Sequence, residues 1–340
     1  MTAPRVPPEG DGSGSRRRLA AAALLVPALA LAGCSSQGGR TPAAAEGEGG
    51  QVARTEPMKI AMVTHAAPGD TFWDVIRKGA EEAAAKDNAE LLYASDPEGG
   101  RQAQLVQQYI DQGVDGIAVT LAKPDAMQDV LQRAEDAGIP VVSLNAGEND
   151  FEEAGAFAHF GSNDELAGET AGQRLQEEGL DHPICVIQEQ GHVGLEARCA
   201  GVKEVLPETE ILYVQGTDMT QVSSTATAKL QTSQEADSII GLGAPYTMTL
   251  LGAKESAGSD VAVASFDMNG ELAQAVVDGD VLFTIDQQPW LQGYLSVDSL
   301  WQHHRGAFRM GGGQPTLTGP AVVDSANAED VLEYADEGIR

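Results

Sequence analysis

Residues 101–120 read RQAQLVQQYIDQGVDGIAVT, and this stretch predicts a helix over 101–112 followed by a short apolar strand over 116–119. The next residues repeat the order. A helix is expected over 124–137, with proline in the first turn that it favours, and VVSL at 141–144 predicts the next strand. Short apolar strands that alternate with helices indicate βαβ units and a parallel sheet buried on both faces.

The same alternation extends to both sides of this stretch. It begins with the apolar run KIAMV at 59–63, restarts after Phe160-Gly161-Ser162-Asn163, and continues to a strand expected at 281–285. The pattern contains roughly ten strands, which is too many for one open sheet of ordinary size. We therefore predict an α/β fold of two doubly wound domains. The remaining sequence predicts one more helix, a glycine turn at 311–313, a strand near Ala321 and a last short helix.

The N-terminal residues have the layout of an export signal. Arginines at 16–18 precede an apolar run at 19–31. At ~1.5 Å per residue this run covers roughly 20 Å, too short to span a membrane. It ends in Leu31-Ala32-Gly33-Cys34, the pattern of a bacterial lipobox. We expect residues 1–33 to be a signal peptide and Cys34 to be lipidated, with an ordinary cleaved signal as the alternative. The arginines also resemble a twin-arginine signal, so the export route stays open.

Residues 34–57 are predicted to be a lipidated cysteine and a flexible tether, because they are rich in Gly, Ala, Ser and Glu without hydrophobic periodicity. No later segment has the pattern of a membrane span, so we expect an exported protein anchored to the outer face of the cell membrane. The formal net charge of −30 argues against nucleic-acid binding and against a basic membrane-binding face.

Open parallel sheets bind ligands at the carboxyl ends of their strands. Side chains suited to hydroxyl recognition stand at these positions: Asp70, Thr71, Phe72, Trp73, Thr120, Asn145, Glu189, His192, Asp267 and Gln287. Phe72 and Trp73 are adjacent aromatic residues at the start of an expected helix, and such residues commonly pack in a hydrophobic core. We favour the alternative that one of them faces a cleft and stacks on a sugar ring, because consecutive helical residues point about 100° apart.

The sequence contains no signature motif of a nucleotide site or a metal site. Gly241-Leu242-Gly243 follows an expected strand, but Tyr246 stands where a dinucleotide-binding loop has its third glycine. His303 and His304 are adjacent and would point to different faces of a helix. We predict no cofactor and no metal.

A hydrolase is the alternative from another class. It needs a positioned nucleophile or paired carboxylates in a cleft. Glu189, His192, Asp267 and Asp286 are the residues that would have to converge. We favour the interpretation that they bind hydroxyls or form ion pairs at the rim.

Cys185 lies in a strand expected at 184–187, and Cys199 lies in the helix expected at 195–206 that follows it. Exported proteins often pair such cysteines, and the helix packs back on the sheet. We favour a disulfide, and two buried thiols are the alternative.

These features together resemble the periplasmic ribose- and galactose-type solute-binding proteins, which have the type I periplasmic-binding fold. The resemblance runs from about Met58 to Val323. Its landmarks are the segments 69–73, 112–117, 137–142 and 161–172, together with Arg198, Gly201, Phe266-Asp267 and Gln287.

The resemblance implies two Rossmann-like lobes joined by a multi-strand hinge, with 58–161 plus 288–318 in the first and 162–287 plus 319–340 in the second. It implies a monomeric, non-enzymatic binding protein that captures a small sugar or polyol and passes it to an ABC transporter permease. Phe72 and Trp73 would sandwich the ligand. Its hydroxyls would be hydrogen-bonded by Asp70, Asn145, Asp267 and Gln287.

The chain departs from this family at three positions. Ala146 and Ala200 stand where the family has arginines, and Gly243 stands where it has an asparagine. The loss of these donors argues against a ribose- or glucose-like ligand. A smaller or acyclic polyol, an inositol or another pentose stays open, with compensation from Glu189, His192 or Arg198.

Two relatives of the same fold are further alternatives. A lactose-repressor-type regulator shares the core, but it begins with a DNA-binding helix-turn-helix, whereas this sequence has a signal peptide and a lipobox. A ligand-sensing receptor of the same fold is the other alternative.

Overall fold

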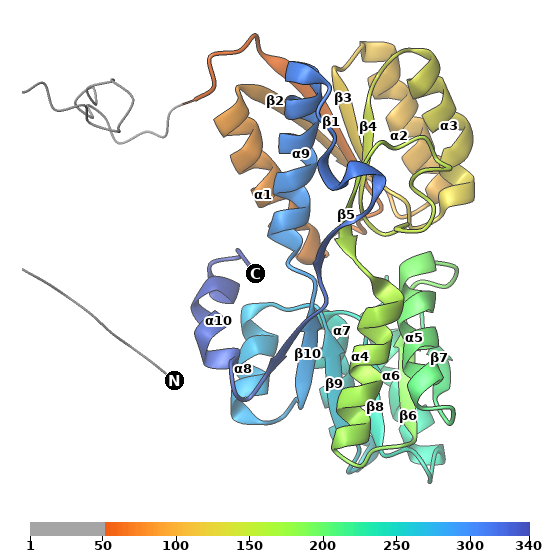
Figure 1. The fold of residues 1–340 in the computed structure, drawn as a ribbon. Helices are drawn as coiled ribbons and strands as arrows, with labels where there is room; N and C mark the ends of the chain where they lie inside the picture. The colour runs from red at the N-terminus through yellow and green to blue at the C-terminus, as the bar shows by residue number, and fades with distance from the viewer. Residues whose placement is uncertain (1–51) are drawn as a thin grey trace, which may run out of the picture. The chain divides into compact units, whose positions relative to one another are not determined.

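The computed structural model describes residues 52–340, and these residues form two α/β lobes (Figure 1). The first lobe contains a six-stranded sheet in the order β11-β5-β4-β3-β1-β2. Its strands are Met58–Thr64 (β1), Ala89–Ser95 (β2), Gly116–Thr120 (β3), Val141–Asn145 (β4), His159–Ser162 (β5) and Thr316–Gly319 (β11). All of its strand pairs are parallel.

The second lobe repeats this architecture with a six-stranded sheet in the order β12-β10-β9-β8-β6-β7. Its strands are Pro183–Ile187 (β6), Glu210–Tyr213 (β7), Ser238–Gly241 (β8), Ala262–Phe266 (β9), Phe283–Asp286 (β10) and Ala321–Asp324 (β12). Only the edge pair of β10 and β12 is antiparallel within the described sheet.

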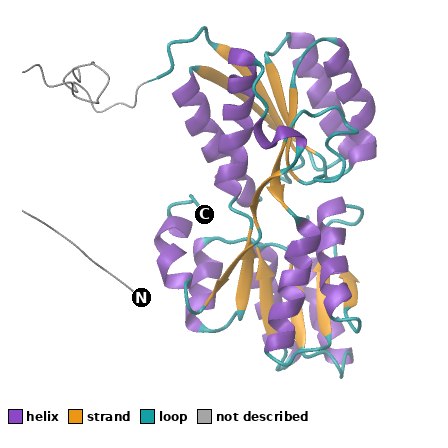
Figure 2. Ribbon diagram, in the orientation of Figure 1, coloured by secondary structure: helices purple, strands orange, loops and turns teal. Residues whose placement is uncertain are grey.

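Helices cover both faces of each sheet (Figure 2). In the first lobe they are Phe72–Asp87 (α1), Gly99–Gln112 (α2), Pro124–Asp136 (α3) and Pro289–Gly306 (α9), followed by a short 3₁₀ turn at Met310–Gly313. In the second lobe they are Asp164–Glu177 (α4), Val193–Val205 (α5), Met219–Thr232 (α6), Ala244–Ala257 (α7), Gly270–Asp278 (α8) and Ala328–Asp336 (α10).

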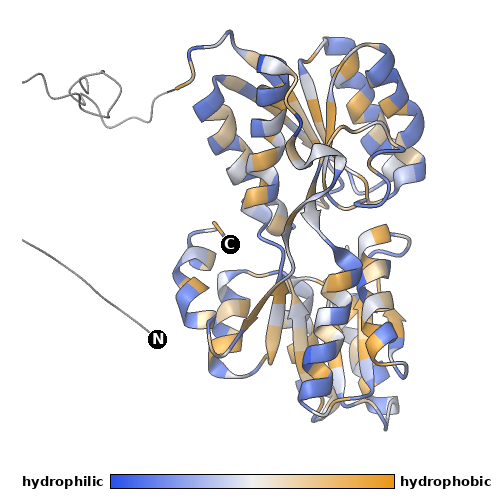
Figure 3. Cartoon of the chain, viewed as in Figure 1, coloured by the Kyte–Doolittle hydropathy of each residue, from blue (hydrophilic) through white to orange (hydrophobic). Residues whose placement is uncertain are grey.

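Each sheet has an apolar core on both of its faces. The central strands β3 and β4 are buried at every residue, as expected for parallel strands between two helical layers. Figure 3 shows the result: the strands are mostly apolar, and polar residues concentrate on the outer faces of the helices.

Helix α9 packs closely on α1, and two glycines make this possible. A Cβ atom on Gly79 would lie 2.0 Å from the carbonyl oxygen of Trp290, and one on Gly293 would lie 1.9 Å from that of Ile76. No side chain fits at such distances. The close contact fixes α9 to the first lobe immediately after the chain has left β10 of the second lobe (Figure 1).

The chain crosses between the lobes from β5 to α4, from β10 to α9 and from β11 to β12. The predicted fold class, two doubly wound lobes joined by a multi-strand hinge, is confirmed. The two sheets contain six strands each, twelve in all, whereas roughly ten strands were expected. The missed strands are β5 and β11, whose sequences HFGS and TLTG are too short and too polar for an apolar pattern to predict.

Several predicted boundaries are also wrong by two residues, and two of them have a clear cause. The strand expected at 281–285 begins at Phe283, because the backbone N–H of Val281 still closes the end of α8 on the Ala275 carbonyl. The helix expected at 195–206 begins at Val193, because the His192 side chain caps it there.

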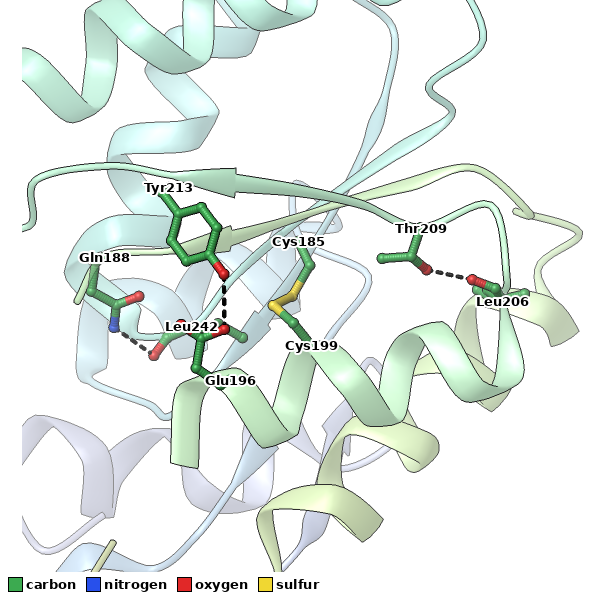
Figure 4. Close-up of a disulfide and its surroundings, with 8 residues drawn as sticks. All are labelled: Cys185, Gln188, Glu196, Cys199, Leu206, Thr209, Tyr213 and Leu242. Atoms are coloured by element: carbon green, nitrogen blue, oxygen red, sulfur yellow. Dashed lines mark hydrogen bonds between the residues drawn. A yellow bond between two sulfur atoms is a disulfide. The ribbon is translucent and has the colours of Figure 1, made fainter. Parts of the chain in front are cut away.

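Cys185 in β6 and Cys199 in α5 form a disulfide, so the prediction of a bridge is confirmed (Figure 4). Their Cα atoms lie 5.8 Å apart, and both residues are buried. On the same helix, Glu196 accepts a hydrogen bond of 2.9 Å from the Tyr213 hydroxyl of β7. The second lobe is therefore cross-linked where α5 lies on its sheet.

Within residues 52–340 no helix is both long and apolar enough to cross a membrane. The predicted signal peptide, the lipobox and Cys34 lie outside the described residues.

Candidate functional site

A cavity of about 800 Å³ lies between the lobes. Segments that follow β1 and β4 line it from the first lobe, and segments that follow β6, β8, β9 and β10 line it from the second. This is the position that doubly wound sheets favour for ligands, since the carboxyl ends of their strands share one edge.

The structure brings together all but one of the residues predicted to bind a ligand. The lining residues among them are Asp70, Thr71, Phe72, Trp73, Asn145, Glu189, His192, Arg198, Asp267 and Gln287.

Thr120 is the exception, because it is fully buried beneath the cavity lining. Its hydroxyl lies 2.7 Å from Nδ1 of His65 and accepts a hydrogen bond of 3.0 Å from the backbone N–H of the same residue. Thr120 therefore lies behind the cavity wall: its side chain supports His65, which does line the cavity.

Asp70, Phe72 and Trp73 form the start of α1 at the cavity wall. Oδ1 of Asp70 accepts a hydrogen bond of 3.1 Å from the backbone N–H of Phe72, and burial raises the pKa of the Asp70 carboxyl. The Trp73 ring packs edge-on against Phe72 and His65, with centroid distances of 5.3 and 4.6 Å. Both predicted aromatics touch the cavity, but Trp73 is only 6% exposed and also belongs to the first-lobe core.

Asn145 and Gln287 link the two lobes at the bottom of the cavity. Nδ2 of Asn145 donates to Oε1 of Gln287 at 3.0 Å and to Oε1 of Gln292 at 3.2 Å. Nε2 of Gln287 in turn donates to Oδ1 of Asp267. The chain of amides thus connects the end of β4 to the ends of β9 and β10.

Arg198 and Asp267 form the charged centre of the site. Nε of Arg198 donates to Oδ1 of Asp164 at 2.7 Å, and Nη1 lies 3.7 Å from Oδ1 of Asp267. The guanidinium also lies over the Phe266 ring at 5.1 Å. Burial raises the pKa of the Asp267 carboxyl to about 6, although the nearby Arg198 and the Gln287 hydrogen bond favour the ionised form. Asp267 is therefore mostly ionised at neutral pH and close to its titration range.

The remaining wall of the cavity holds His65, Glu189 and His192, whose potential ligand atoms all lie within 4.8 Å of one another. Nε2 of His65 lies 3.0 Å from Nε2 of His192, and Glu189 forms an ion pair of 2.8 Å with Lys123. In the described residues this is the single cluster with the composition of a cation site.

The hydrogen bonds of His192 do not fit a metal ligand. Its Nδ1 accepts from the backbone N–H groups of Gly194 and Leu195, at 3.1 and 3.3 Å. A neutral ring whose Nδ1 accepts must carry its proton on Nε2, the atom that faces His65. Metal-bound histidines instead donate their other ring N–H to an acceptor.

A family model described as a periplasmic binding protein domain matches residues 60–307. The chain belongs to this family. The xylose/arabinose-binding protein of Sulfolobus acidocaldarius is 25% identical to it over 274 residues, which cover 74% of this chain and 67% of that protein. The ribose import binding protein of Bacillus subtilis is 22% identical over 235 residues, covering 67% and 76%.

The comparison with solved structures supports the same family assignment. A carbohydrate transporter from Acidothermus cellulolyticus, crystallised with myo-inositol, is 43% identical, with a TM-score of 0.83 over 84% of this chain and 100% of that one. These relatives are named for sugar binding, sugar import or carbohydrate transport. The predicted resemblance to the ribose- and galactose-type solute-binding proteins is thus confirmed.

Sequence reasoning about this periplasmic binding protein missed several cavity residues. His65, Lys123, Asp164, Gln188 and Tyr246 all line the cavity, but none was among the candidates. His65 and Gln188 directly follow β1 and β6, so the rule that located the other candidates would have found them. In the sequence, Asp164 stood out only as part of the landmark segment 161–172. Its contact in the site depends on Arg198, which lies 34 residues away in the sequence.

Proposed function

We propose that this periplasmic binding protein is the extracytoplasmic component of an ABC importer, held at the membrane by lipidated Cys34, that captures a small polyol or sugar between its lobes. The observation that carries the proposal is the cavity between the lobes, to which both contribute hydrogen-bonding side chains: Asn145 from one lobe and Asp267, Arg198 and Gln287 from the other. A ligand that touches both lobes favours the closed arrangement, and a transporter can distinguish that arrangement from the open one.

The chemistry of the cavity suits neutral polyhydroxylated ligands. A hydroxyl group donates to a carboxylate such as Asp267 and accepts from a guanidinium or amide such as Arg198 or Asn145. Phe72 and Trp73 add an aromatic surface for the C–H face of a ring. The charged groups largely pair with one another, as Arg198 does with Asp164 and Lys123 with Glu189, which disfavours a strongly charged ligand.

Within this class we favour a cyclic polyol of the size of inositol. The relative that is 43% identical was crystallised with myo-inositol. Ala146 and Gly243, where ribose- and galactose-type proteins carry larger donors, both line the cavity. A Cβ atom at Gly243 would lie 3.0 Å from Cδ2 of Tyr246, so the tyrosine ring occupies the space that an asparagine would need.

The test is a thermal-shift and calorimetric screen of the purified protein with myo-inositol, D-ribose, D-xylose, D-galactose and acyclic polyols. We expect myo-inositol to bind most tightly. Chromogenic glycosides of the same sugars should be recovered unchanged, whereas a hydrolase would release the chromophore. Asp267→Asn should weaken the interaction, and the exposed Asp260→Asn serves as the matched control. Binding of none of these compounds, or equal affinity in Asp267→Asn, would refute the proposal.

The anchor is tested separately. Cys34→Ala should move the protein from the membrane fraction to the soluble fraction, and mass spectrometry of the native protein should find an acyl group on Cys34. An N-terminus that begins after residue 34 would contradict the proposed lipidation.

A further inference from the structure

Three contacts join the lobes along one wall of the cavity. Nε2 of His65 lies 3.0 Å from Nε2 of His192, and Nζ of Lys123 lies 2.8 Å from Oε1 of Glu189. The backbone N–H of Val193 donates to the carbonyl of Ala122 at 3.1 Å. The first-lobe groups follow β1 and β3, and the second-lobe groups follow β6 or begin α5. These contacts can form only when the lobes lie together.

The proton positions in the histidine pair, His65 and His192, follow from their neighbours. Nδ1 of His192 accepts from two backbone N–H groups and caps α5, so the proton of the neutral ring is on Nε2. That Nε2–H points at Nε2 of His65, which must therefore accept. The His65 proton is consequently on Nδ1 and points at the Thr120 hydroxyl, 2.7 Å away. That hydroxyl also accepts from the backbone N–H of His65 at 3.0 Å, and its second lone pair is open to the ring because Nε2 of Gln102 has the carbonyls of Thr120 and Val63 as acceptors. One continuous chain of hydrogen bonds thus runs from α5 through both rings to β3.

We propose that the histidine pair is a pH-sensitive latch between the lobes, which forms only when both rings are neutral, so that acidification opposes closure and speeds ligand release. A proton added to His65 would have to reside on Nε2, against the donor of His192. A proton added to His192 would reside on Nδ1, against the N–H groups that begin α5. Either event breaks the chain of hydrogen bonds.

The groups around the histidine pair also disfavour protonation of the two rings. Both rings are buried, and Trp73 packs edge-on against His65. The charged groups that face the pair are Lys123 at the start of α3, Arg198 on α5, Glu189 after β6 and Asp164 on α4. Each carboxylate is paired with one of the cations, and both cations disfavour an added proton on His192. Burial, with a smaller contribution from Lys123, lowers the pKa of His65 to about 3, and burial lowers that of His192 well below 6.5.

The size of the effect follows from proton linkage. When the lobes separate and the rings meet water, each histidine should titrate near ~6.5. Below that pH the open arrangement binds protons that closure must release. Each histidine then weakens closure by about tenfold per pH unit, so at pH 5.5 the pair should weaken it by about 100-fold relative to pH 7.5.

The test rests on the proposed function only for its probe, myo-inositol. Calorimetry from pH 7.5 to 5.5 should show affinity falling steeply, with protons released on binding at the lower pH. His192→Asn keeps a side-chain oxygen to cap α5 but removes the bond to His65, and His65→Gln removes the other titrating ring. At pH 5.5 each single variant should bind myo-inositol about tenfold more tightly than the pH-dependent loss of the native protein predicts. The double variant should lose almost no affinity between pH 7.5 and 5.5. The exposed His304→Gln is the control. A pH profile that both variants leave unchanged would overturn the latch.

A second measurement is independent of the ligand. In ¹⁵N-histidine NMR of the protein without added sugar, closed molecules at pH 7.5 should show the Nε2–H tautomer of His192 and the Nδ1–H tautomer of His65, and on acidification both rings should take up protons together as the lobes separate. Substituting one should change the tautomer or pKa of the other. Independent titration of both rings near 6.5 would reject the latch even if myo-inositol binds. The expected spectra would support it even if myo-inositol does not bind.

Discussion

The two lobes have the same sheet order but place different chemistry at equivalent positions. Strand β4 in the first sheet corresponds to β9 in the second. Asn145 ends β4 with φ 67°, and Asp267 follows β9 with φ 62°. Asparagine and aspartate adopt this left-handed conformation more readily than other residues with a side chain. The repeated backbone turn therefore places one short polar side chain from each lobe at the cavity.

The difference lies in charge. The first lobe provides Asp70 and Lys123, a neutral amide and two aromatic rings, whereas the second provides the clustered charges of Asp164, Arg198 and Asp267. The second lobe also carries the disulfide, while in the first lobe α1 is held to its sheet by apolar packing. The comparison shows that repeated architecture fixes where the functional groups lie and that the individual residues fix what they bind.

The largest expected effect concerns the disulfide of the second lobe. Replacing both Cys185 and Cys199 with alanine should lower the free energy of unfolding by about 3 kcal/mol, because the bridge closes a loop of about 15 residues. Denaturant unfolding measures the change, and thiol titration of the unfolded, unreduced protein should find neither cysteine free. Unchanged stability in the double variant would mean that apolar packing alone stabilises the second lobe, as it does the first.

The next effect compares Asp267 with Asn145 directly. Asp267→Ala should weaken myo-inositol binding by about 10- to 100-fold, since charge-assisted hydrogen bonds contribute roughly 1.5–3 kcal/mol each. Asn145→Ala should weaken it by less than about tenfold, because neutral hydrogen bonds contribute about 1 kcal/mol. Calorimetry on both variants tests the contrast. A larger loss for Asn145→Ala would place the dominant interaction in the first lobe.

A smaller effect links the Asp267 charge to stability. Its pKa is raised from 3.8 to about 6 in the folded protein, so folding favours the protonated form. The stabilisation is present below pH 4 and is lost as the pH rises through 6. Asp267→Asn, which cannot ionise, should therefore be more stable than the native protein at pH 7.5, by about 1–2 kcal/mol after the loss of contacts with Gln287 and Arg198. Thermal unfolding at pH 4 and 7.5 should show this gain only at the higher pH.

The smallest effect concerns the aromatic wall of the first lobe. Trp73→Ala would remove core packing as well as stacking, because Trp73 is part of the first-lobe core. Trp73→Phe retains most of that packing and should weaken binding only about threefold, since aromatic stacking contributes about 0.5–1.5 kcal/mol. Titration with myo-inositol decides the matter. A loss as large as that of Asp267→Ala would reverse the proposed division of roles between the lobes.

The sequence by itself determined the alternation of strands and helices and the ends of most strands. Period and apolar content are local properties, so they were sufficient to place Asn145, Asp267 and Gln287 at one edge of their sheets. The cysteine pair was also accessible, because a strand and the helix that follows it must pack together.

Only the tertiary structure decided which of these residues meet across the lobes and what each one does. The local pattern treated Thr120 and His192 alike, but packing placed Thr120 beneath His65 and brought His192 to it from 127 residues away. Similarly, packing in the first-lobe core set the burial of Trp73, and the ion pair with Arg198 fixed the position of the Asp164 carboxylate. The physical reason is that burial, proton positions and pKa depend on all atoms within a few ångströms, and the chain supplies those atoms from segments that no local pattern connects.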